Sequence, residues 1–203
     1  MAIKEYGYNY LIANFKRKLR NTLASSDDIV TIISPTEDAR FDIDQILLGG
    51  TYEVYNSSTG KNEKVVLQAY IPDFYYVPDT IVENKLFICI ESFVDTITDN
   101  IMSEFFIDVW VFTQKTNVIL TEYTVPKSSE VNTLGYMGNR IDVACAMIEN
   151  LFKGSEKYGL GIIRANPRSF ITVGSPTTEY YGKKMRFTVN GYVPLESGDV
   201  CGN

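Results

Sequence analysis

Residues 104–113 read Glu-Phe-Phe-Ile-Asp-Val-Trp-Val-Phe-Thr, and the rest of the fold is organised around this stretch. Because neighbouring side chains of a strand point to opposite faces, a strand here is apolar on both faces. Such a strand must be covered above and below, which predicts a central position in a sheet. Only Asp108 interrupts the run, and a covered carboxylate needs a hydrogen-bonding partner or a wet edge. We interpret Asp108 as structural. One face carries Phe105, Ile107, Val109 and Val111, and the other carries Phe106, Trp110 and Phe112.

Two amphipathic helices are predicted, because apolar residues recur at steps of three to four. The first begins near Tyr8 and fades at residues 25–28. The second covers residues 139–153, with Asn139 as N-cap and Gly154 placed to end it in a left-handed conformation. The first stripe consists of Tyr8, Leu11, Ile12, Phe15, Leu19 and Leu23, and the second of Ile141, Ala144, Cys145, Ile148, Leu151 and Phe152.

Further strands are expected on both sides of the central one. Residues 29–34 are β-branched and stopped by Pro35, which favours a strand over more helix. Residues 85–94 are strand-like and should pair antiparallel with the central strand. Two more strands, 162–173 and 180–193, should be joined through residues 174–176. In the last strand Met185, Phe187 and Val189 alternate with Lys184, Arg186 and Thr188, which predicts one buried and one wet face.

Residues 37–84 are interpreted as an insertion built on a β-hairpin. Segments 51–55 and 64–70 are β-rich and flank a turn-forming cluster at residues 56–63. Gly49 and Gly50 allow a hinge at the base of the hairpin. The aromatic loop Phe74-Tyr75-Tyr76 either caps the core or binds a partner. The sequence therefore predicts one α+β domain over residues 1–203: a mixed, mainly antiparallel sheet packed by an N-terminal helix and a helix of the C-terminal half, with a hairpin insertion.

The charge distribution is uneven. A net charge of −6 and a pI near 4.8 argue against a nucleic-acid footprint over the whole surface. Residues 1–23 hold five cations against Glu5, a net +4, so the other 180 residues sum to −10. This basic start either faces the acidic body of a neighbouring subunit or forms a solvated helix face. The fourteen tyrosines fit a strand-rich core or a contact surface.

Side chains that could perform catalysis or bind a metal are scarce, so we expect no enzyme activity, no cofactor and no metal. The chain has no histidine, which removes the commonest general base and metal ligand. Its three cysteines, Cys89, Cys145 and Cys201, have no metal-ligand spacing, and the odd count argues against a disulfide framework. Asp42 with Asp44, and Asp95 with Asp99, lack the ligand density of calcium loops. The glycines at 159 and 161 follow a helix rather than a strand, so they predict a loop. No signal peptide or membrane span is expected.

In element order and in its second half, the sequence resembles the tail-terminator proteins of long-tailed bacteriophages, and also their neck and tail-completion proteins. The resemblance covers roughly half of the chain. It lies in the basic N-terminal helix, the strand Phe106-Ile107-Asp108-Val109-Trp110-Val111-Phe112, the helix opening Asn139-Arg140-Ile141-Asp142, and the closing segment from Tyr180 to Val189.

The resemblance implies a non-enzymatic virion protein in the neck or upper tail, assembled in the host bacterial cytoplasm. It would form a homo-oligomeric ring, a hexamer, that caps the tail tube, ends its polymerisation and joins it to the head connector. The tube protein, the connector or neck protein and a sheath are the implied partners; DNA would only pass through the lumen. The alternatives are a head-closure or head-tail adaptor protein and, from another class, a small-molecule-binding α+β domain. The expected partner-interface residues are Lys16, Arg17, Lys18, Arg20, Tyr52, Tyr55 and Tyr70.

Overall fold

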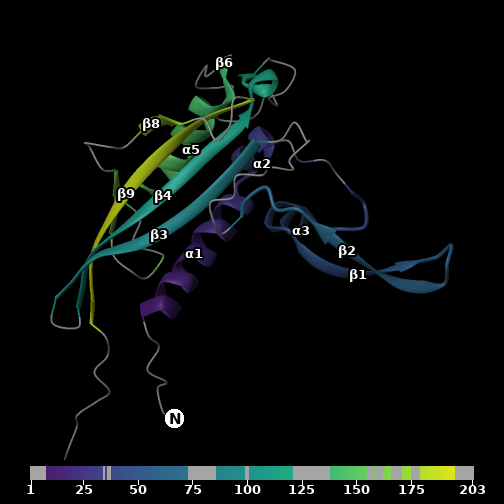
Figure 1. Ribbon diagram of the computed structural model, residues 1–203, viewed down its shortest axis with the longest axis horizontal. Helices are drawn as coiled ribbons and strands as arrows, with labels where there is room; N and C mark the ends of the chain where they lie inside the picture. The colour runs from purple at the N-terminus through teal and green to yellow at the C-terminus, as the bar shows by residue number, and fades with distance from the viewer. Residues whose placement is uncertain are drawn as a thin grey trace, which may run out of the picture.

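The computed structural model is an α+β protein with a mainly antiparallel sheet, which confirms the predicted class (Figure 1). It describes residues 8–33, 35, 38–72, 86–98, 101–120, 138–154, 158, 162–165, 171–174 and 179–194. The helices are α1 (Tyr8–Ala24), α2 (Asp27–Ile33), α3 (Ile43–Leu48) and α5 (Arg140–Phe152), with a 3-10 turn at Lys115–Asn117. The strands are β1 (Gly50–Asn56), β2 (Lys61–Leu67), β3 (Leu86–Thr98), β4 (Ile101–Gln114), β5 (Ile119–Leu120), β6 (Gly138–Asn139), β7 (Ile162–Ala165), β8 (Ile171–Gly174) and β9 (Tyr180–Pro194).

The main sheet has the strand order β3-β4-β9-β7, with β8 also paired to β9, and all pairings are antiparallel. β4 therefore lies inside the sheet between two long strands, as its sequence predicts. The register sets Asp108 opposite Glu91 on one side and opposite Arg186 on the other. Side chains at these three positions therefore share one face of the sheet.

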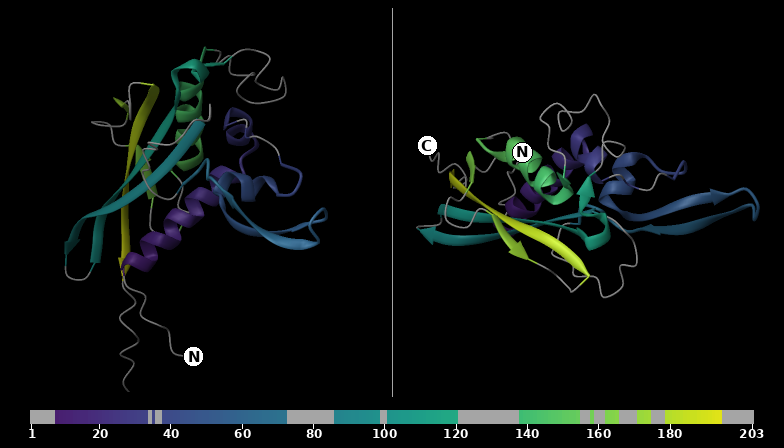
Figure 2. Two further views of the ribbon diagram at one scale, coloured as in Figure 1. Left: turned by 45° about the vertical axis from the view of Figure 1, so that its right-hand side comes forward. Right: turned by 90° about the horizontal axis from the view of Figure 1, so that it is seen from above.

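The opposite face of the sheet carries the hydrophobic core. Phe105, Ile107, Val109 and Val111 are at most 1% exposed, as the alternation predicts. Helices α1, α2 and α5 lie together on this side (Figure 2). The ring of Phe15 from α1 meets that of Phe105 edge-on, with centroids 5.2 Å apart. The predicted α5 stripe is buried, Leu151 partly so, and Asn139 caps the helix by accepting from the backbone N–H groups of Ile141 and Asp142.

The second face of β4 differs from the prediction of a fully covered strand. Phe112 is 1% exposed and packs in a small cluster with Phe87, Cys89 and Tyr180. Farther along β4, Trp110 and Phe106 are only half-buried. Among the described residues no helix packs on this face, and the ring of Tyr70 stacks on that of Phe87. A run of apolar residues in the sequence does not show whether a strand face is covered by a second layer of structure or left partly exposed.

The expected strand at residues 29–34 is wrong, because helix α2 covers Asp27–Ile33. Ile29, Ile32 and Ile33 are buried at helical spacing, and Asp27 and Asp28 occupy the first turn. Acidic side chains there favour a helix through its dipole. The Ser26 hydroxyl also accepts from the Ile29 backbone N–H at 3.5 Å. Burial of the isoleucines in the core between α1, α5 and β3 overrides their β preference.

The insertion contains the predicted hairpin and also a helix, α3, that the prediction lacks. Asp42 and Gln45 cap this helix reciprocally, as in a capping box. The hairpin strands are β1 and β2, so residues 68–70 lie outside the hairpin and the turn is shorter than expected. The predicted strand 162–173 appears as two short strands, β7 and β8. The aromatic loop at residues 74–76 lies outside the described residues.

Candidate functional site

The most distinctive surface feature is the hairpin arm, which we define as β1, β2 and the turn between them. It projects from the body as a separate two-stranded sheet (Figure 1). None of its residues is buried. Gly60, with a φ of 68°, takes the left-handed position that closes the turn, and the Asn56 side chain donates to Glu63 at 2.8 Å.

The base of the arm is fixed by close packing rather than by the free hinge that two glycines suggest. Gly49 has a φ of 66°, and a Cβ there would lie 2.6 Å from the Ala69 backbone nitrogen. Arg20 of α1 donates to the Leu48 carbonyl at 3.0 Å and to the Ile71 carbonyl at 2.8 Å. One guanidinium thus binds the chain both before and after the hairpin, which sets the direction of the arm.

The arm carries two large apolar side chains in solvent. Tyr55 is 65% exposed and Val66 is 75% exposed. The register pairs Val66 with Thr51 and Tyr55 with Asn62, so both point to the same face of the ribbon. An exposed apolar face on a two-stranded sheet indicates a surface for another molecule.

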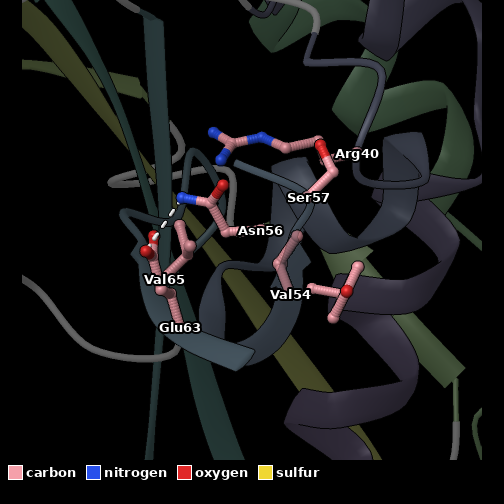
Figure 3. A pocket seen from close by; sticks show the side chains of 7 residues that line it. Arg40, Val54, Asn56, Ser57, Glu63 and Val65 are labelled. Carbon is pink, nitrogen blue, oxygen red and sulfur yellow. Dashed lines mark hydrogen bonds between the residues drawn. The ribbon is translucent and has the colours of Figure 1, made fainter. Parts of the chain in front are cut away.

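A shallow cavity of about 230 Å³ lies where the arm meets the segment before α3 (Figure 3). Arg40, Val54, Asn56, Glu63 and Val65 are among its lining residues. The Arg40 guanidinium binds the Asp38 carboxylate at 2.7 Å and lowers the pKa of that carboxyl to about 2. Small-molecule sites are larger and mostly apolar, about 300–1,000 Å³. This open, ion-paired hollow does not resemble such a site.

The basic residues of α1 mostly contact their own chain. Lys16 pairs with Glu91 at 3.4 Å, and Lys18 donates to the Tyr158 carbonyl at 3.2 Å. Arg17 donates to Asn14 at 2.8 Å and is exposed. With Arg20 bound at the base of the arm, Arg17 and Lys18 are the two members of this predicted set that are exposed.

The three predicted interface tyrosines lie in different environments. Tyr52 donates to the Gly49 carbonyl at 3.1 Å, and its ring lies 5.5 Å from that of Phe41. Tyr70 is 2% exposed and stacks on Phe87 inside the core, so it has no surface to offer a partner. Of the three, only Tyr55 projects into solvent.

A second surface feature is the open sheet face, which we define as the side of β3, β4, β9 and β7 that faces away from α1 and α5. Asp108 is held there by Arg186, at 2.6 and 2.7 Å, and by Lys184 at 2.8 Å. The Arg186 guanidinium lies 5.0 Å from the ring centroid of Phe93 and 5.1 Å from that of Phe106, and the Lys184 ammonium lies 5.2 Å from that of Trp110. These cation–π contacts fix the cations over half-buried rings. The predicted need of Asp108 for a partner is confirmed.

Sequence reasoning identifies the wet face of β9 but not this cluster. Lys184 and Arg186 are recognised as solvent-facing, and Asp108 as a carboxylate that needs a partner. Only the register between β4 and β9 brings them together. A carboxylate in one strand and cations along one face of another strand could have suggested the pairing, because opposite charges at facing positions of neighbouring strands attract each other.

Arg140 is a buried cation that sequence reasoning also missed. It is 4% exposed and donates to the Ile32 carbonyl at 2.6 Å and to the Asn117 carbonyl at 3.0 Å. Burial lowers the pKa of its guanidinium. These bonds tie the end of α2 and the 3-10 turn to the start of α5, so its role is structural.

Groups able to perform catalysis or bind metal are few in the described part of the chain. Cys145 is buried on α5, where desolvation raises the pKa of its thiol to about 12, as suits a small core residue. Asp42 and Asp44 stand exposed at the start of α3. No cluster of three or more cysteine and acidic side chains suited to a metal ion occurs among the described residues. No described helix is long and apolar enough to cross a membrane.

Comparison with known proteins identifies a family but no activity. No curated protein and no solved structure matches the sequence. A family model described as YomW matches residues 26–189, from the residue before α2 into β9. That description states no function, and the name, of a Bacillus prophage type, is consistent with a phage-associated protein. Because the match covers more than half of its length, the chain belongs to the YomW family.

Proposed function

We propose that this protein is a structural component of a phage neck or upper tail, a tail terminator. In this role, identical subunits form a closed ring, hypothetically of six, on the finished tail tube. The ring ends polymerisation of the tube and presents a surface to the head connector. The tube protein, the connector and, in a contractile tail, the sheath are then its partners. The phage-type family name and the order of elements after β2 support this assignment.

The observation that carries the proposal is the hairpin arm. An isolated two-stranded ribbon is marginal in water. This one has no buried residue and exposes Tyr55 and Val66 on one face. A protein that keeps such an arm at a fixed angle, with Arg20 and Gly49 at its base, has a surface ready for another subunit.

The position of the arm supports a ring. It projects from one side of the body (Figure 2), where it could reach a different surface of the next subunit. Contacts of this heterologous kind close into rings when the rotation between subunits permits. Apolar contacts of the arm would hold the subunits together, while exposed charges mainly set orientation and association rate.

The test compares two altered arms with a matched control. One variant combines Tyr55→Ser and Val66→Ser, and the other deletes residues 56–63 and rejoins the strands with a short turn. The control is Ile119→Ser, which removes an apolar residue that is 72% exposed on β5, outside the arm. Circular dichroism and urea unfolding establish that each variant folds.

Assembly is then measured by electron microscopy of the purified protein alone and with tail tubes of its phage. We expect the parent and the Ile119→Ser control to form closed rings and cap tubes. Both arm variants should fold and fail in assembly. Arm variants that cap tubes as well as the parent would make the arm irrelevant and the proposal wrong.

A further inference from the structure

We propose that the open sheet face binds the acidic start of α3 from a second copy of this chain. This inference rests on the ring proposed above and names a contact within it, separate from the hairpin arm. The acidic partner segment consists of Asp42, Ile43 and Asp44. In this contact, a positively charged sheet surface lined by aromatic rings faces two exposed carboxylates. One exposed apolar side chain lies between the two carboxylates.

The positive side is a built surface rather than a scatter of cations. Lys184 and Arg186 are held by Asp108 and by ring contacts, with side chains 23% and 26% exposed. Arg164 of β7 pairs in register with Thr188, which places it on the same face, and it is exposed. Arg164, Lys184 and Arg186 carry three positive charges and Asp108 one negative charge, so this cluster has a net charge of +2. Nearby Glu91 is paired with Lys16. Preorganised cations lose little conformational freedom when a carboxylate arrives.

Each of the two proposed contact surfaces carries an exposed apolar side chain beside its charges. Phe93 is 39% exposed at the edge of the open sheet face, and Ile43 is 40% exposed between Asp42 and Asp44. Both aspartates are exposed, and they add negative charge beside the ion pair of Asp38 with Arg40. A basic surface with an aromatic edge thus matches an acidic segment with an aliphatic centre. Each surface also carries the charge that would repel a copy of itself.

The two surfaces belong to different parts of one molecule. α3 packs on α1, and Arg20 of α1 binds the Leu48 carbonyl at the end of α3. α3 therefore lies beside α1, past the edge of the sheet formed by β3 (Figure 1), while the open sheet face is turned away from α1. We therefore place the contact between two molecules. Contacts between two unlike surfaces join subunits head to tail, as a ring requires.

The test is a charge swap between Arg164 and Asp44. The three variants are Arg164→Glu, Asp44→Arg and their combination, and none removes an ion pair described above or the capping pair of Asp42 and Gln45. Lys153→Glu, at the residue after α5, is the control: its side chain is 63% exposed, belongs to neither surface and loses only its ion pair with Glu149. Neutral variants, Arg164→Gln and Asp44→Asn, provide a second set in case a reversal impairs folding.

Self-association is measured by sedimentation velocity at low and at physiological salt. Each single reversal should raise the dissociation constant about tenfold or more, because like charges then meet across the contact. The combination should return it to within about threefold of the parent, and the Lys153→Glu control should stay at the parent value. Association of the parent should weaken with salt, since screening acts over about 8 Å at physiological ionic strength.

The outcomes separate this contact from the ring itself. If the double reversal does not recover association while arm variants still abolish it, this contact is wrong and the ring proposal stands. Equal association of all variants also rejects it. A parent that stays monomeric at high concentration and on tail tubes overturns both. If Arg164→Glu instead abolishes binding of a single-stranded oligonucleotide and leaves self-association unchanged, the open sheet face serves nucleic acid and the inference fails.

Discussion

The molecule contains two antiparallel hairpins that differ in what covers them. In β3–β4 one face is closed by helices, and its residues 86, 88, 90, 105, 107, 109 and 111 are at most 1% exposed. In β1–β2, seven residue pairs are in register and no residue is buried. Backbone pairing is therefore similar in the two, and packing is not. Because most stabilisation comes from apolar burial, β3–β4 belongs to the folding unit, while β1–β2 is free to serve a partner.

The largest expected effect is in the body, from Ile148→Ala. Ile148 is fully buried on α5 against the sheet. Removing its side chain should lower the free energy of unfolding by about 2–5 kcal/mol, the cost of lost burial plus a cavity. Urea unfolding followed by circular dichroism measures this loss. A change under about 0.5 kcal/mol would mean that this helix face is outside the core.

Arg20→Ala should have an intermediate effect, because this residue joins the body to the arm. Its loss leaves the Leu48 and Ile71 carbonyls without this donor. We expect a fall of about 1–3 kcal/mol in the free energy of unfolding. The turn at residues 57–60 should also be cleaved faster in limited proteolysis. Arg17→Ala, an exposed neighbour on the same helix, is the control, and equal effects of the two variants would contradict a bracing role.

Val66→Ala should barely change the stability of the isolated subunit. The side chain is 75% exposed on the arm, and surface substitutions of this kind stay within about 0.5 kcal/mol. Urea unfolding of the dilute protein tests this, with Ile148→Ala as the contrasting case. A loss above about 1 kcal/mol would show that the arm contributes to the folding unit, which would remove the contrast between the two hairpins.

The smallest effect concerns pH at the ion pair of Asp38 and Arg40, beside the arm. Asp38 has a pKa of about 2 in the folded protein against an ordinary value of 3.8, because Arg40 hydrogen-bonds its carboxylate. The folded pKa is the lower one, so any stabilisation from this pair is present above pH 3.8 and is lost as the pH falls towards 2. Carboxyl chemical shifts measured by NMR should give this low midpoint. In Arg40→Gln the midpoint should return to the ordinary range, and an unchanged midpoint would exclude Arg40 as the cause.

The basic residues of α1 show what a charge pattern in the sequence predicts and what it does not predict. Its basic stripe correctly indicates the face away from the core, while Phe15, Leu19 and Leu23 are buried as predicted. The pattern does not reveal that Lys16 and Arg20 have partners in their own chain. Those partners, Glu91 and the Ile71 carbonyl, are more than fifty residues away. Long-range approach of this kind is not encoded in local spacing.

Helix α2 and Tyr70 were misjudged for a related reason. Isoleucines before a proline favour a strand locally, yet burial against the sheet selects the helix. Tyr70 continues a β-rich segment, yet its backbone carbonyl accepts from the Ile88 N–H and its ring enters the core. In both cases the deciding contact is with β3 or its neighbours rather than with adjacent residues.

By itself, the sequence determined the α+β class, the interior position of β4, helices α1 and α5 with the Asn139 cap, and the existence of the hairpin. These follow from periodicity and from local capping and turn chemistry, which act over a few residues. Only the tertiary structure decided that Asp108 meets Lys184 and Arg186, that the second face of β4 stays partly open, and that Arg20 fixes the base of the arm. Those features depend on strand register and on packing between distant segments, and a one-residue shift of register would reverse every face.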